Sequence, residues 1–312
     1  MASTMTIHPK TALYIKLGEG GGWERECIQK DQTLRLGYQE VDHWLCCQGR
    51  WEEVATELLS SKTPKYRGAA TRHANQVRLF YESGEDVLWV TFFGDRLWWC
   101  FSRPEVTLLP DKSKTRPVIG SWNCCDAKDE PLEVSRLSGK LVTMQRFQGT
   151  ICAVKEFDYV LRKINAVPEP LVEAAKLARG ELVGRIATII RNLHWRDFEI
   201  LVDLIFHQAG WQRISELGGT QKTFDLKLVS PITGERYAVQ VKSEADLATF
   251  ASYEHRFSDM EAFARAYFVV HSPSKDLLEH PRTGKVELLG PDQIAERSVR
   301  YGLVDWIIDK AG

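Results

Sequence analysis

Two prolines near the middle of the chain separate parts with different sequence patterns. The segment N-A-V-P-E-P, residues 165–170, disfavours a helix because a residue that precedes proline is driven out of the helical region. With 312 residues, the chain is also long for a single hydrophobic core. We therefore predict two domains, residues 1–165 and 191–312, connected by a linker helix over residues 166–190.

The residues before this division have the pattern of a β-rich domain. Thr11 to Leu17 forms a short apolar run, and two aromatic, β-branched runs predict a hairpin from Val87 to Phe101. We expect a helix at 51–59, an exposed connection at 102–118 and a further β segment at 141–154. The first domain is therefore predicted to be a β-rich, barrel-like α+β domain.

After Pro170, helices and strands alternate, which is typical of an α/β layer fold. Leu171 to Leu193 is predicted as a long helix, interrupted or bent near its glycines, and Phe198 to Ala209 as a second helix capped by Asp197. The remaining elements are strands at 223–229, 237–243, 266–271 and 286–289, with helices from about Ala245 and from Pro291.

Composition says little about the function of the protein but more about its cellular compartment. The net charge of −1 does not mark a nucleic-acid binder, although carboxylates gathered in a site can mask a local basic groove. No apolar run approaches the ~18 residues of a membrane span, and the N-terminus lacks a signal-peptide pattern. Seven cysteines, an odd number without an export signal, favour reduced thiols. We expect a cytoplasmic protein with no membrane partner.

The polar residues that most strongly indicate chemistry lie between Thr223 and Ser243. A turn centred between Ile232 and Thr233 would place opposite one another the positions whose numbers add to 465, so Asp225 would face Gln240. Gln240 and Lys242 are two residues apart and share a face of their strand. The pattern thus predicts Asp225, Gln240 and Lys242 together on one face of a hairpin.

Phosphodiester hydrolysis uses such a group of side chains. A carboxylate and a second oxygen ligand can hold Mg²⁺, whose remaining positions are filled by water and phosphate. The metal lowers the pKa of a bound water, and a nearby ammonium orients that water and stabilises the charged transition state. An exposed hairpin that merely carries three polar residues would have the same spacing, so spacing alone leaves both interpretations open.

The flanking residues resemble the PD-(D/E)xK nuclease superfamily, and in particular Mrr-like restriction enzymes. The likeness consists of Phe198-Glu199, an apolar helix, Gly210-Trp211, a loop with two glycines, Asp225, and the run Gln240-Val241-Lys242. It covers about residues 195–275. The resemblance implies a core of helix, three strands, helix and strand, with a mixed central sheet.

Carried over by position, the resemblance assigns roles to individual residues. Asp225, Gln240 and Glu199 would hold the metal, which is Mg²⁺ with Mn²⁺ as an alternative, and Lys242 would be the motif lysine. Most members have Asp or Glu where this chain has Gln240, so the number of metals stays open. Glu199 could instead belong to a solvated helix stripe. Gln221 and Lys222 come just before the strand of Asp225. We predict that they contact the substrate phosphate, with simple surface residues as the alternative.

Seven of the ten tryptophans precede residue 123, more than one small core is expected to use. We predict that Trp23, Trp89, Trp98 and Trp99 contact substrate as walls of a pocket for a base turned out of the duplex, with core packing as the alternative. Trp98 and Trp99 are adjacent and should point to opposite faces of a strand. The glycine-rich start and the strand pattern are similar in style to PUA-like, EVE and YTH readers of modified bases.

These features predict a Mg²⁺-dependent endonuclease that cuts double-stranded, modified DNA in the manner of type IV restriction. One alternative is a nuclease that acts on RNA or on structured or damaged DNA. A second is a nucleic-acid-binding protein that has lost catalytic activity. For the oligomeric state, a homodimer is an open alternative to a monomer.

Overall fold

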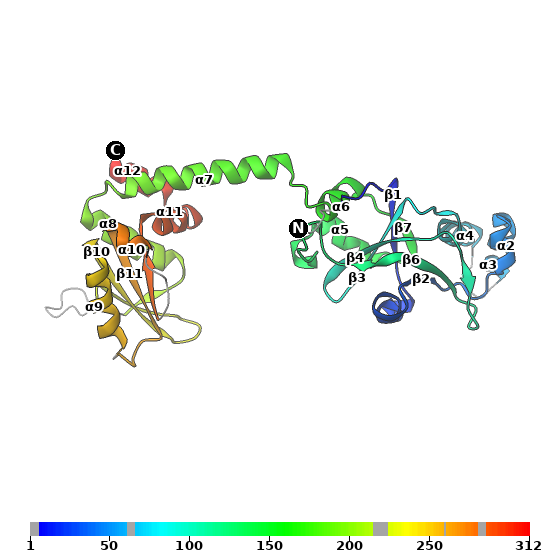
Figure 1. Ribbon diagram of the computed structural model, residues 1–312, viewed down its shortest axis with the longest axis horizontal. Coiled ribbons are helices and arrows are strands. Elements are labelled where there is room, and N and C mark those ends of the chain that lie inside the picture. Colours follow the sequence, from blue (N-terminus) through cyan, green and yellow to red (C-terminus); the bar gives the residue numbers. More distant parts are fainter. Residues whose placement is uncertain (1–5, 61–65, 215–223, 259, 280–284) are drawn as a thin grey trace. The chain divides into compact units, whose positions relative to one another are not determined.

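The computed structural model describes residues 6–60, 66–214, 224–258, 260–279 and 285–312 (Figure 1). The chain divides into two compact units, Met1–Glu169 and Pro170–Gly312. Helix α7 (Pro170–Ile190) begins at the second proline of the expected linker and buries Ile186, Ala187 and Ile190 in the core of the second unit. Contrary to the prediction, α7 is continuous through its two glycines, which a long helix tolerates at about 1 kcal/mol each.

The first unit is built on a curled, mixed sheet in which β1 runs parallel to β3 and the other paired strands run antiparallel (Figure 1). Its order is β2-β6-β4-β3-β1-β7, with β5 paired to β6. The strands are β1 (Thr11–Ile15), β2 (Thr33–Leu36), β3 (Val87–Phe93), β4 (Arg96–Ser102), β5 (Thr107–Leu108), β6 (Lys114–Asn123) and β7 (Ile151–Ala153).

The predicted hairpin is confirmed as β3 and β4. Gly94 and Asp95 connect the two strands, and both have positive φ (56° and 57°), as a tight two-residue hairpin turn requires. The helices of this unit are α1 (Glu24–Glu26), α2 (His43–Cys47), α3 (Trp51–Ser60), α4 (Arg67–Glu82), α5 (Gly139–Val142) and α6 (Phe157–Ile164). The seven cysteines are all free thiols, as expected.

Two predictions for the first unit are wrong in part. The expected connection at 102–118 is mostly exposed from 103 to 112, but it contains β5 and the buried first half of β6, and most of the expected β segment at 141–154 is helical or irregular. The first error arises because Lys114 and Arg116 are fully buried. Lys114 donates to the carbonyl of Val41 (3.0 Å), and Arg116 donates to that of Phe80 (2.5 Å), so the protein supplies partners that water would otherwise provide.

The second unit contains a five-stranded mixed sheet in the order β12-β11-β10-β9-β8. Strands β10, β11 and β12 run parallel, whereas β9 and β8 are antiparallel to their neighbours. The strands are β8 (Gln212–Arg213), β9 (Leu226–Val229), β10 (Arg236–Ala245), β11 (Arg265–Pro273) and β12 (Val286–Leu289). The helices are α8 (Trp195–Gln208), α9 (Leu247–Ser258), α10 (Lys275–Glu279), α11 (Pro291–Arg300) and α12 (Val304–Ala311).

The run α8, three strands, α9 and β11 has the order of elements that the family resemblance implies. One local prediction is wrong, because α8 begins three residues earlier than expected and Asp197 does not cap it. His194 is the cap residue, and its Nδ1 accepts a hydrogen bond from the backbone of Arg196 at 3.3 Å. Asp197 instead lies 3.5 Å from the ammonium of Lys310.

Both faces of the central strand β10 are covered. Val239 and Val241 pack into the core formed with α7, α8, α11 and α12, and Ala238 packs into the core formed with α9 and α10. Successive side chains of a strand point to opposite faces, so a strand buried on both sides reads as a continuous apolar run. The polar residue Gln240 interrupts that run and is nevertheless buried, with only 9% of its surface exposed. Within the described ranges, none of the helices combines the length and apolar content needed to cross a membrane.

Candidate active site

The predicted hairpin register is confirmed between β9 and β10. Arg236 lies opposite Val229 and Val239 opposite Leu226, so the numbers of facing residues add to 465. Asp225 directly precedes β9, and its N–H donates to the carbonyl of Val239 at 3.1 Å. This bond continues the pairing by one residue and brings the Asp225 side chain to the level of Gln240.

The Asp225 carboxylate is held in place by donors from the opposite strand. Its Oδ2 accepts a hydrogen bond from the backbone N–H of Val241 at 2.7 Å and a second, short bond from Nε2 of Gln240. Bonds to a charged acceptor are stronger than neutral ones and contribute about 1.5–3 kcal/mol. The carboxylate therefore has a fixed orientation.

A hollow of about 240 Å³ opens beside this carboxylate. Helix α8 contributes Trp195, Phe198 and Glu199, and the hairpin contributes Asp225 and the run Gln240–Ser243. All four residues predicted as catalytic thus line one hollow: Asp225, Gln240, Lys242 and Glu199. Gln221 and Lys222, predicted to contact phosphate, lie outside the described residues.

The structure separates Glu199 from its neighbour on the same helix stripe. Asp203 lies 3.6 Å from Arg213 and is not part of the hollow, whereas Glu199 forms part of its wall. The two carboxylates are one helical turn apart on α8, so only the one nearer the helix start reaches the hairpin. The solvated-stripe interpretation of the sequence fits Asp203 better than Glu199.

Two residues at the site were not singled out from the sequence. Trp195 is 46% exposed and forms part of the wall of the hollow. Tyr253 of α9 is buried, and burial together with the negative charge of Asp225 raises the pKa of its phenol. Its hydroxyl has no hydrogen-bond partner in the part of the chain that the structure describes. Tyr253 therefore remains neutral, and it is not among the residues that line the hollow.

The donor set of this hollow suits a hard divalent cation. Asp225 and Glu199 offer carboxylate oxygens and Gln240 an amide oxygen, which are the ligand types that Mg²⁺ prefers. Gln240 would have to turn its amide so that oxygen replaces nitrogen toward the cation, a rotation that leaves its shape unchanged. Among the described residues, no group of three or more His, Cys, Asp or Glu side chains could hold a metal. A cation here would therefore depend on Gln240 and on water.

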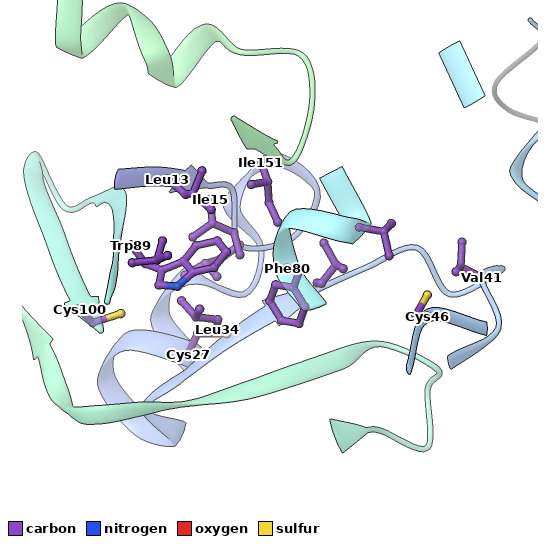
Figure 2. Packing of buried hydrophobic residues seen from close by; sticks show 14 of the residues in the cluster. Leu13, Ile15, Cys27, Leu34, Val41, Cys46, Phe80, Trp89, Cys100 and Ile151 are labelled. Atoms are coloured by element: carbon purple, nitrogen blue, oxygen red, sulfur yellow. The ribbon is translucent and has the colours of Figure 1, made fainter. Parts of the chain in front are cut away.

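The predicted aromatic pocket of the first unit is not formed by the four tryptophans named from the sequence. Trp89 is fully buried in a hydrophobic core (Figure 2). Its ring packs edge-on against Phe80 with centroids 6.1 Å apart, and the guanidinium of Arg116 lies 5.7 Å from its centroid. Trp89 is a packing residue, which corrects the prediction that it contacts substrate.

The other three tryptophans do not share one environment: Trp23 and Trp98 border the core that contains Trp89, whereas Trp99 does not. Trp98 packs on the core that contains Trp89, and Trp99 packs on the core of the opposite sheet face, which confirms the predicted alternation. Their indole N–H groups donate to backbone carbonyls at 2.9 and 3.0 Å. Trp23 lies against the backbone of Gly18, with Arg35 4.3 Å from its centroid. Trp98 and Trp99 cannot wall the same pocket.

Comparison with known proteins adds little to this geometry. No family model matches the sequence, and no curated protein matches it. Among solved structures, the chain is similar to one described as the DNA modification-dependent restriction endonuclease AspBHI, at 13% sequence identity. The superposition covers 72% of this chain and 68% of that chain with a TM-score of 0.26, which does not establish a shared fold.

Proposed function

We propose that the second unit is a metal-dependent nuclease that hydrolyses phosphodiester bonds of DNA in the hollow beside Asp225. One observation carries this proposal. A carboxylate fixed by Val241 and Gln240 shares a small hollow with the ammonium-bearing Lys242 and with a second carboxylate, Glu199. Nothing in the packing of a simple surface hairpin requires these charges to converge across a helix and two strands.

Each side chain of the hollow would have a different role in hydrolysis. Lys242 is exposed at the hollow, where its ammonium can orient an attacking water and stabilise the negative charge that develops on the phosphoryl oxygens. The Val241 N–H holds the Asp225 carboxylate in place, and this bond remains when Gln240 turns its amide oxygen toward the cation. Trp195 offers a partly exposed ring on which a base next to the cleaved bond can stack.

Asp225, Glu199 and Gln240 would hold the Mg²⁺. When bound, the ion would lower the pKa of a water molecule and neutralise charge on the phosphate. Because Gln240 is neutral, these residues bring two negative charges where a set of three carboxylates would bring three. We therefore expect weaker metal binding than at a site with three carboxylates, and Mn²⁺ as an effective substitute.

We further propose that the first unit selects the DNA, with a modified base as the feature recognised. Contacts to phosphate carry no sequence information, so a hydrolytic hollow of this kind needs a second surface to choose its substrate. Such recognition would not use Trp89, which is buried. It would also not use Trp98 and Trp99 together in one pocket, because they lie on opposite faces of the sheet. The residues that would contact the base are not assigned.

One observation favours a second candidate function, a nucleic-acid-binding protein without catalysis. An amide stands beside Asp225 where a nuclease would gain from a carboxylate, and it donates a hydrogen bond to Asp225. Exposed Lys242 and Trp195 would still contact a phosphate and a base in such a protein.

A cleavage panel separates these functions. The full chain is incubated with Mg²⁺ or with a chelator and with four substrates of one sequence: a DNA duplex with base modifications, the same duplex without them, a duplex that contains a mismatch, and an RNA. We expect Mg²⁺-dependent cleavage of modified duplex DNA. Cleavage of RNA alone or of mismatched DNA alone would show that the substrate is RNA or damaged DNA instead. Binding without any cleavage would establish the second candidate function.

A further inference from the structure

A second hollow, of about 310 Å³, lies in the same unit at the other end of α8. It is lined by four aromatic residues, Phe206, Trp211, Tyr267 and Tyr301, by the basic residues Arg297 and Arg300, and by the acidic residue Glu296. We call it the aromatic–arginine hollow. Its volume is at the lower end of the ~300–1,000 Å³ typical of small-ligand pockets.

The aromatic wall is fixed by the way α8 ends. Gly210 has a positive φ of 89°, the N–H of Trp211 donates to the carbonyl of Phe206 at 3.0 Å, and that of Gly210 donates to the carbonyl of His207 at 2.9 Å. These two bonds define a Schellman ending, which turns the chain back so that Trp211 lies near the last turn of the helix. Trp211 remains partly exposed although it packs on the core.

Further ring contacts hold this wall rigid. Trp211 meets Tyr237 edge-on with centroids 4.4 Å apart, and Tyr237 is stacked with Tyr267 at 6.2 Å. Tyr267 also packs against Phe206 at 5.0 Å. Burial and the negative charge of Glu287 raise the pKa of Tyr267, so its phenol remains neutral. A preformed aromatic wall loses little conformational entropy when a flat ring binds to it.

The two arginines differ in how firmly they are held. Arg297 is tied to Glu287 at 3.1 Å and to the carbonyl of Gln293 at 3.2 Å, and its side chain is 30% exposed. Arg300 is 59% exposed and pairs with Glu296 at 3.2 Å, one turn away on the same helix. Exposed pairs of this spacing contribute only about 0.3–0.5 kcal/mol, so Arg300 can leave Glu296 for an anion at little cost.

From this geometry we propose that the aromatic–arginine hollow binds one unpaired nucleotide of the substrate strand, its base against the aromatic wall and its phosphate at Arg300. This inference rests on the proposed nuclease function. Seven residues of α8 separate Glu199 from Phe206, which corresponds to about 10 Å at ~1.5 Å per residue. The bound nucleotide is therefore expected within a few positions of the cleaved phosphate.

An unpaired nucleotide fits better than a base pair. A base inside a duplex has both faces covered by its neighbours, whereas aromatic walls bind bases whose faces are free. The proposal therefore places a single-stranded or locally opened segment next to the cut. Free mononucleotides share the same chemistry, and the experiment must distinguish them from a strand.

The test uses the full chain carrying Asp225→Asn, so that a strand stays intact, and measures anisotropy of a fluorescein-labelled oligothymidylate. Adding Arg300→Ala should weaken binding about tenfold, the effect of one charged hydrogen bond, and Trp211→Leu should weaken it about five- to fiftyfold through lost stacking. Arg185→Ala is the matched control, because Arg185 also pairs one turn away with an exposed glutamate (2.8 Å to Glu181) and lines neither hollow. It should bind normally.

Arg300 is exposed, so its replacement leaves the fold intact even if Trp211→Leu destabilises the unit. Equal binding by Arg300→Ala and the Arg185 control would overturn the inference, as would binding of thymidine monophosphate but not of the oligonucleotide. A different result would refute the proposed nuclease function. It is refuted if the unmodified chain cuts no nucleic acid, whatever these variants bind.

Discussion

Replacing Asp225 by asparagine tests the candidate site while preserving its packing. Asn keeps one oxygen, which at the position of Oδ2 can accept both bonds that this atom now receives, from the Val241 N–H at 2.7 Å and from the Gln240 amide. Leaving the buried N–H without an acceptor, as Asp225→Ala does, would cost about 1–3 kcal/mol of folding stability. Asp225→Asn should cost less than about 1 kcal/mol.

The effect of Asp225→Asn on cleavage should be far larger. It removes the negative charge that holds the cation, and loss of one electrostatic contact to a reacting centre costs about 2.7–4 kcal/mol, or 10²–10³ in rate. Single-turnover cleavage of DNA with Mg²⁺ gives the rate, and thermal unfolding gives the stability. Asp203→Asn is the matched control, since Asp203 is a carboxylate of the same unit, on helix α8, that lies outside the hollow. Cleavage by Asp225→Asn within tenfold of the control would refute the assignment.

Three further predictions concern other residues. Glu199→Gln should slow cleavage about ten- to hundredfold and raise the Mg²⁺ concentration needed for half-maximal rate; an unchanged Mg²⁺ titration would remove Glu199 from the metal site. Trp89→Ala should lower the free energy of unfolding by about 3–5 kcal/mol in denaturant titrations, whereas Trp44→Ala, at a residue 69% exposed, should be nearly neutral, and equal effects would contradict the packing role. Burial raises the pKa of Glu24 from 4.5 to about 7, so the chain should lose stability relative to Glu24→Gln as pH rises through that interval. A stability difference independent of pH between 4 and 8 would contradict that shift.

The hairpin of the candidate site could be predicted from sequence because its register is a local property. A proline and a glycine mark the turn, and once the turn is placed, every facing pair is fixed. The convergence of Asp225, Gln240 and Lys242 follows from that register and from the alternation of side chains along a strand. Glu199 needed the family resemblance, because the sequence pattern of α8 does not distinguish Glu199 from Asp203.

Features that depend on distant partners could not be predicted. Lys114 and Arg116 look like surface residues in the sequence, and they can be buried because carbonyls from other segments accept their hydrogen bonds. Whether Trp89, Trp98 and Trp99 are buried in a core or line a pocket depends on what covers each face of the sheet. The alternation of side chains along a strand does not reveal this. Tyr253 gave no signal, since it is one of several apolar residues on the buried face of α9.

Direct observation of a metal in the hollow tests the central claim most sharply. Crystals of the full chain soaked in Mn²⁺ and measured at the manganese absorption edge would show the ion by anomalous scattering. We expect one strong peak in the hollow, in contact with carboxylate oxygens of Asp225 and Glu199, and its loss in crystals of Asp225→Asn. A peak elsewhere in the second unit, or none at a saturating Mn²⁺ concentration, would contradict the account.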